Sequence, residues 1–227
     1  GQGKVSRNNT IGIVGRITKQ PELIVDASDW KSRTYEAPLE RTRPGGRNDR
    51  YIIRFDGRAA GTEEMLDRIR LAENVEVLAG GEIRTENVRD PKPEENRVMM
   101  YIDVEVIAVD DPPVNDQNEV MICGNVCRPP YFRLSGRRAE KGIRGAVGGI
   151  MVAVNSPGAT AYIPCVCHGR LALCAGRLKV GDRVRIYGRF VARNYPKRIP
   201  GRRVPYWSTV NEVRVVWLEC GEMEDRA

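Results

Sequence analysis

The chain has 227 residues, of which 41% are hydrophobic and 30% are charged, and this length suits two globular domains. No run reaches the roughly 18 consecutive apolar residues that a membrane-spanning helix needs, so we expect a soluble, cytoplasmic protein without membrane contact. The charge is uneven: residues 1–111 hold 18 Lys and Arg against 21 Asp and Glu, whereas residues 112–227 hold 19 against 9. The net charge of +10 in the second half indicates a polyanionic partner, although a basic surface also serves solubility alone.

Short runs rich in Val and Ile alternate with polar residues along the chain and are separated by turn residues. This pattern is typical of half-buried strands, so we expect a mainly β protein. The expected strands are 10–17, 51–55, 74–79, 98–109, 120–126, 149–154, 162–168, 183–191 and 210–218. Two helices are also expected, one over 62–71 with Thr62 as its N-cap and a shorter one over 171–178.

The two halves of the chain repeat each other at an offset of about 109 residues. Asn9–Ile17 aligns with Asn118–Val126, and Pro21 falls opposite Pro130. In both halves the order is strand, long polar loop, strand, short helix, strand, loop and final strand. Five short strands with a helix between the third and fourth form the OB arrangement, although strand counting alone also allows other small barrels.

We therefore predict two tandem OB-fold barrels, each with five strands and a short helix. The first, over residues 1–111, is diverged and net acidic, and the second, over residues 117–227, is strongly basic. Residues 112–116 form the expected linker, because the paired prolines at its start cannot continue a β-ladder.

Three motifs follow one another in the second half. Thr160–Ala172 ends in Gly-Arg-Leu-Ala, Leu178–Val184 reads Leu-Lys-Val-Gly-Asp-Arg-Val, and Gly188–Tyr195 reads Gly-Arg-Phe-Val-Ala-Arg-Asn-Tyr. With Asn118–Val126, they resemble the bacterial single-stranded DNA-binding protein family over nearly all of the second half. The first half resembles this family clearly in Asn9–Leu23 and weakly afterwards. Because the family's long acidic tail does not follow, the resemblance implies a specialised member, from a mobile element or similar to the primosomal replication protein N.

The resemblance implies sequence-tolerant binding of single-stranded DNA in replication, recombination or DNA transfer, by base stacking and phosphate contacts. Tyr162, His168 and Tyr195 fall where the family stacks bases, and stacking tolerates any sequence because every base has a π-face. Arg189 and Arg193 occupy alternate positions of one strand, so they can follow the phosphates on one face. The resemblance also implies a homodimer with four OB barrels.

Basic residues interleaved with aromatic ones complete the candidate binding set, because a single-strand groove needs charge for the backbone and rings for the bases. In the second half these residues are Arg128, Tyr131, Arg133, Arg170, Lys197, Arg198, Arg202, Arg203, Tyr206 and Trp207. In the first half we include Arg16, Arg43 and Arg47, the last two from a basic loop over 41–50 that is either a second DNA contact or disordered. Asp56 stands there in place of a stacking ring, so we expect the first barrel to bind weakly or to serve packing and dimerisation.

The remaining chemistry-bearing residues favour binding over catalysis. All six cysteines follow residue 120 and are expected to be reduced, and strand alternation predicts that Cys165 and Cys167 are core residues rather than metal ligands. The single histidine has no fixed relation to a nucleophile, and no phosphate-binding loop is present, so we expect no enzyme activity, cofactor or metal. Two alternatives stay open: RNA in place of DNA, and an OB-fold scaffold for replication or conjugation proteins.

Overall fold

The structure is a computed structural model that describes residues 7–71, 74–88, 97–109, 116–134, 136–198, 200–204 and 206–220. The chain forms two compact units. We call residues 11–118 with 191–211 the N-terminal unit, and residues 1–10, 119–190 and 212–227 the C-terminal unit. The hairpin at 191–211 is thus part of the N-terminal unit. Of the predicted linker, only Asp116 lies within the described residues.

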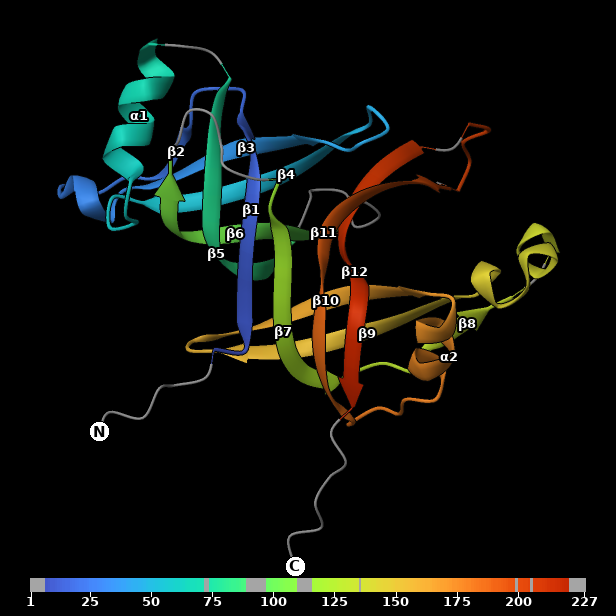
Figure 1. The fold of residues 1–227 in the computed structure, drawn as a ribbon. Helices are drawn as coiled ribbons and strands as arrows, with labels where there is room; N and C mark the ends of the chain where they lie inside the picture. The colour runs from blue at the N-terminus through green and yellow to red at the C-terminus, as the bar shows by residue number, and fades with distance from the viewer. Residues whose placement is uncertain are drawn as a thin grey trace, which may run out of the picture. The chain divides into compact units, whose positions relative to one another are not determined.

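The N-terminal unit contains a closed barrel of five strands. Its elements in chain order are β1 (Asn9–Ile17), β2 (Glu22–Val25), η1 (Trp30–Ser32), β3 (Thr34–Thr42), β4 (Asn48–Asp56), α1 (Thr62–Leu71), β5 (Val75–Val88) and β6 (Arg97–Ala108) (Figure 1). β1 pairs with β3, β3 with β4, β4 with β6 in parallel, β6 with β5, and β5 with β1. This is the OB strand order with α1 in its expected place, and β2 is a short extra strand on β3.

Helix α1 is fixed to the barrel by its apolar side and by its first turn. Met65 and Ile69 are buried against β5 and β6. Gly61 precedes the helix with φ +86°, and a Cβ at this position would lie 1.7 Å from the carbonyl oxygen of Ile107. Thr62 is the first helical residue, and its hydroxyl donates to the carbonyl oxygen of Asp56 at 3.2 Å, so the predicted N-cap role of Thr62 is wrong.

The second barrel has the same strand order. Its elements are β7 (Asn118–Val126), β8 (Tyr131–Arg133), η3 (Gly136–Gly145), β9 (Val147–Ser156), β10 (Ala159–His168), α2 (Arg170–Gly176), β11 (Arg183–Lys197) and β12 (Tyr206–Cys220). β7 pairs with β9 and β11, β9 with β10, β10 with β12 in parallel, and β12 with β11. β8 is the short extra strand and pairs with β9. The core includes Cys165 and Cys167, as strand alternation predicted.

The predicted fold class is confirmed, because both barrels have the OB order and all nine expected strands are present. α1 has the predicted bounds, and α2 spans Arg170–Gly176 instead of residues 171–178. The predicted repeat is also confirmed at its start, since β1 and β7 each span nine residues at an offset of 109.

The prediction of a long polar loop after β1 is wrong. β3 occupies much of it and continues to Thr42, and β4 begins at Asn48, so the basic loop expected over 41–50 is a tight turn. β3 is difficult to recognise because its outward positions hold only threonine, glutamate and proline, and only Ala37 and Leu39 enter the core. The loop expected before the final strand of the second half is likewise shorter than predicted, because β11 continues to Lys197 and β12 begins at Tyr206.

Candidate nucleic-acid interface

One row of residues crosses four strands of the second barrel. Tyr131 on β8 lies opposite Gly149 on β9, Gly149 opposite Val166 on β10, and Val166 opposite Arg214 on β12. Residues directly opposite each other on neighbouring strands share a sheet face. Tyr131 and Arg214 therefore point to the same side of the sheet, and both are exposed.

A second row lies beside the first on the same side. Arg133 is opposite Val147, and Val147 is opposite His168 at the end of β10. Tyr162 is also on this side, because it is an even number of residues from His168, and it is 51% exposed. We call Tyr131, Arg133, Tyr162, His168 and Arg214 the β10 face. It combines three rings with two cations and extends about 20 Å along β10, at about 3.3 Å per residue.

Gly149 explains how Tyr131 lies on this face. A Cβ at position 149 would be 2.0 Å from Cε1 of Tyr131, so the ring rests directly on the glycine backbone. The guanidinium carbon of Arg133 lies 5.4 Å from the centre of the same ring, within the range of a cation–π interaction. The missing side chain at Gly149 thus lets an aromatic ring and its cationic neighbour lie close to the sheet.

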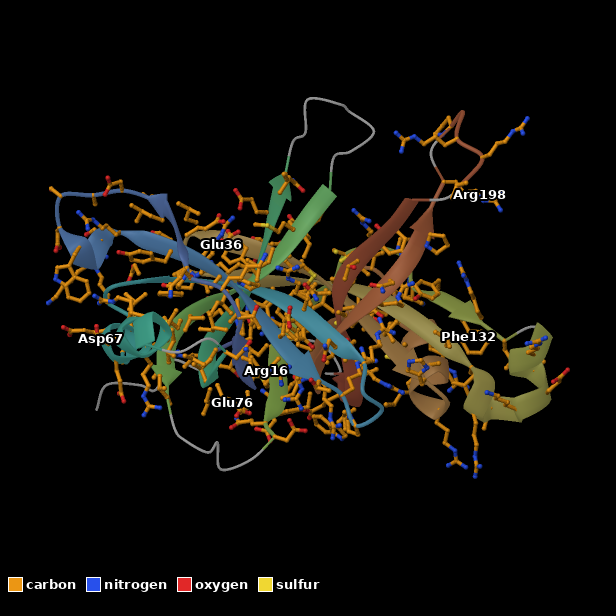
Figure 2. All side chains as sticks on the ribbon, turned by 90° about the horizontal axis from the view of Figure 1, so that it is seen from above. Arg16, Glu36, Asp67, Glu76, Phe132 and Arg198 are labelled. Carbon is orange, nitrogen blue, oxygen red and sulfur yellow. The ribbon has the colours of Figure 1, made fainter. Side chains whose placement is uncertain are left out.

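The β11–β12 hairpin, in the N-terminal unit, carries a second group of predicted residues. The guanidinium carbon of Arg193 is 5.8 Å from the ring centre of Tyr195. Thr209 donates from its hydroxyl to Asn194 at 2.8 Å and so links the two strands. Arg198 is exposed near the turn of the hairpin (Figure 2). Arg202 and Arg203 are exposed as well. Lys197, Tyr206 and Trp207 belong to β11 and β12, but their side chains lie outside the described set.

The other predicted residues of the second half do not belong to the β10 face. Arg128 follows β7, Arg170 begins α2 and Arg189 lies on β11, and all three are exposed.

The three arginines predicted in the first half are engaged within the N-terminal unit. Arg16 donates to Oγ1 of Thr42 at 3.1 Å. Arg43 and Arg47 each donate to the carbonyl oxygen of Ala192, at 2.9 and 3.0 Å. All three guanidinium groups therefore already have partners in the folded chain.

The two barrels differ in how their cations are compensated. In the first barrel, Arg54 forms ion pairs of 2.8 Å with both Glu36 and Glu86. Burial alone would lower the pKa of Arg54, but the hydrogen bonds to these two carboxylates raise it above its usual value. Residues 117–220 hold 18 Lys and Arg against five Asp and Glu, so most of their cations cannot have a carboxylate of their own. The second barrel is therefore the one with positive charge to offer an anion.

Two features of the second barrel were not predicted. Arg214 joins the β10 face only through the parallel pairing of β12 with β10, which no local sequence pattern reveals. Tyr187 and Trp217 form an exposed aromatic pair with ring centres 5.3 Å apart. The signal for Tyr187 was present, because it alternates with buried residues on β11.

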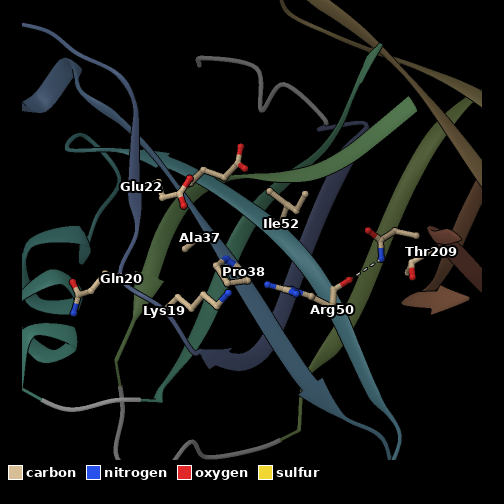
Figure 3. A pocket seen from close by; sticks show the side chains of 10 residues that line it. Lys19, Gln20, Glu22, Ala37, Pro38, Arg50, Ile52 and Thr209 are labelled. Carbon is tan, nitrogen blue, oxygen red and sulfur yellow. Dashed lines mark hydrogen bonds between the residues drawn. The ribbon is translucent and has the colours of Figure 1, made fainter. Parts of the chain in front are cut away.

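A cavity of about 430 Å³ lies in the N-terminal unit (Figure 3). Its wall mixes cations with carboxylates, Lys19 and Arg50 with Glu22 and Glu36. This mixture favours no single sign of ligand charge. On one side, Nδ2 of Asn211 donates to the carbonyl oxygen of Arg50 at 3.1 Å.

The described residues form neither a membrane-spanning helix nor a metal-binding cluster. Among the described residues, no helix is long and apolar enough to span a membrane. Within the same ranges, no three His, Cys, Asp or Glu side chains converge in a way that could hold a metal ion.

Two solved structures match this chain over nearly its whole length. Both are of the single-stranded DNA binding protein from Thermus aquaticus. The wild-type structure is 20% identical, has a TM-score of 0.68 and matches 96% of this chain and 95% of that chain. A deletion mutant of the same protein matches 94% of each chain at the same identity and TM-score. No protein-family model and no curated protein matches the sequence. The chain thus shares the fold of these two structures.

Proposed function

We propose that this chain binds single-stranded DNA without sequence preference, chiefly through the β10 face. The observation that carries the proposal is the alignment of Tyr131, His168 and Tyr162 with Arg133 and Arg214 on one exposed side of the second barrel. Rings that stack on bases beside cations that attract phosphates are what sequence-tolerant binding needs. The similar proteins from Thermus aquaticus, whose names state single-stranded DNA binding, support the choice of ligand.

The hairpin between β11 and β12 supplies further contacts in this proposal. Arg193, Arg198, Arg202 and Arg203 are exposed there, and Tyr195 lies beside Arg193. Lys197, Tyr206 and Trp207 remain candidates from the sequence, as do Arg128, Arg170 and Arg189. Lysine and arginine side chains along the path of a flexible DNA strand bind its phosphates without distinguishing its bases.

The wider role follows from this activity. A non-enzymatic DNA binder of this kind would act in the cytoplasm, in replication, recombination or DNA transfer. The family resemblance also supports a homodimer with four barrels. Analytical ultracentrifugation tests the assembly, because a homodimer has twice the monomer mass of 25.5 kDa.

Titration of a fluorescent oligo-dT into the full chain at several salt concentrations tests the proposal. We expect tight binding at low salt that weakens steeply as salt rises, because each phosphate contact releases counterions, and we expect duplex DNA to bind far more weakly. Absence of binding at low salt would refute the proposal and favour the scaffold alternative. Competition between oligo-dT and oligo-U of equal length decides between DNA and RNA.

A further inference from the structure

Two arginines from the turn between β3 and β4 hold one carbonyl group of β11. Nη2 of Arg43 lies 2.9 Å and Nη2 of Arg47 lies 3.0 Å from the carbonyl oxygen of Ala192. All three residues belong to the N-terminal unit. Arg193 and Tyr195, two residues of the proposed DNA-binding hairpin, follow directly after this carbonyl.

The two arginines are in turn anchored by Asp49, which is only 1% exposed. Oδ2 of Asp49 lies 2.5 Å from Nε of Arg43, and Oδ1 lies 3.8 Å from Nε of Arg47. Within the described residues, Oδ1 is buried without a hydrogen bond, so the ion pair with Arg47 is its compensation. A buried carboxylate without a cation beside it strongly destabilises the folded protein. The ion pairs with Asp49 therefore hold both arginines near β4.

The other strand of the hairpin is held as well. Asn211 on β12 donates through Nδ2 to the carbonyl oxygen of Arg50 on β4 at 3.1 Å (Figure 3). Both strands are thus tied to the first barrel where the hairpin begins. We call Arg43, Arg47, Asp49 and Asn211 the hairpin bracket.

We infer that the first barrel positions the β11–β12 hairpin through this bracket. Arg43 and Arg47 are positioning residues: their guanidinium groups fix the backbone at Ala192 and leave the contacts with nucleic acid to the residues beyond it. A hairpin that is already ordered does not have to be ordered at the moment of binding, and this raises affinity. The effect on DNA affinity rests on the proposed function, whereas the effect on hairpin order does not.

Asp49→Asn separates positioning from simple charge. The substitution removes a negative charge, so a purely electrostatic role for this cluster predicts tighter binding of a polyanion. Loss of the anchor for Arg43 and Arg47 predicts the opposite, a loss of affinity of about tenfold as the hairpin becomes less ordered. Glu76→Gln is the matched control, because it makes the same charge change at an exposed position of β5 outside the bracket.

The readouts are amide hydrogen exchange in residues 192–197 and 206–211 and affinity for oligo-dT, with thermal unfolding to verify folding. We expect about tenfold faster exchange in these segments in Asp49→Asn and no change in Glu76→Gln. If Asp49→Asn does not fold, Arg47→Gln alters the bracket at a half-exposed residue and should also speed exchange. If Asp49→Asn folds and its hydrogen exchange is unchanged, the bracket does not hold the hairpin and the inference is overturned. If exchange is faster but oligo-dT binds equally or more tightly, the bracket does not position the hairpin for binding. If the wild-type chain does not bind oligo-dT, the proposed function is refuted but the bracket is not. The hydrogen-exchange measurement tests the bracket without DNA.

Discussion

Replacement of Tyr162 by alanine tests whether the β10 face stacks bases. The side chain is 51% exposed, so its removal leaves no closed cavity and should cost roughly half of the ~3–5 kcal/mol that a fully buried ring is worth to folding. Loss of one stacked base should cost about 1–3 kcal/mol of binding free energy, or about 5- to 160-fold in affinity. The dependence of affinity on salt should stay the same, because the ring contacts a base and no phosphate.

Fluorescence titration with oligo-dT at three or more salt concentrations measures both quantities. Trp30→Ala is the control, because Trp30 is similarly exposed at 42% but belongs to the first barrel. We expect Trp30→Ala to bind like the wild type. Equal losses in the two variants would show that exposed rings act nonspecifically, and an unchanged affinity in Tyr162→Ala would refute the stacking role.

Three further outcomes follow from the structure. Arg214→Gln should weaken binding of all sequences alike and lower the magnitude of the salt slope by about 0.7, as measured by the same titration. Gly149→Ala should destabilise the fold by about 1–3 kcal/mol in chemical denaturation and weaken DNA binding, because the new methyl group collides with the ring of Tyr131. Burial and the charge of Asp49 raise the pKa of the Tyr51 hydroxyl. The unfolded chain therefore loses the hydroxyl proton at a lower pH than the folded chain, and the free energy of unfolding should fall as the pH rises above about 10. Tyr51→Phe should remove that part of the pH dependence in denaturation curves at pH 9 and 11.

The strands that the sequence revealed are those whose inward side is continuously apolar. β10 shows this, because its buried positions include Ile163, Cys165 and Cys167. β3 was missed because only two of its nine residues are buried, and polar or charged residues take most of the other positions. One of these charges, on Glu36, is compensated across the sheet by Arg54 on β4. Taken alone, the β3 segment therefore has the composition of a polar loop, although it forms a strand of the folded barrel.

The β10 face, which we propose binds DNA, was predictable only in part for a similar reason. Tyr162 and His168 were found through family motifs within one strand, whereas Arg214 reaches them through a strand pairing that spans 48 residues between Val166 and Arg214. Charge composition also said nothing of which arginines already have partners in the fold. Arg43 looked like a phosphate contact, yet its guanidinium group bridges Asp49 and the carbonyl oxygen of Ala192.

Equivalent positions at the ends of β4 and β10 show why the two barrels should act differently. Each strand ends just before a glycine, with Asp56 in the first barrel and His168 in the second. Oδ1 of Asp56 accepts a hydrogen bond from the backbone of Arg58, so its negative charge is held at the site where a ring would meet a base. The adjacent cation on β4, Arg54, is neutralised by two carboxylates. If the second barrel stacks bases as proposed, a DNA strand would meet repulsion at the equivalent place on the first barrel. The first barrel should then influence binding through the hairpin that it holds.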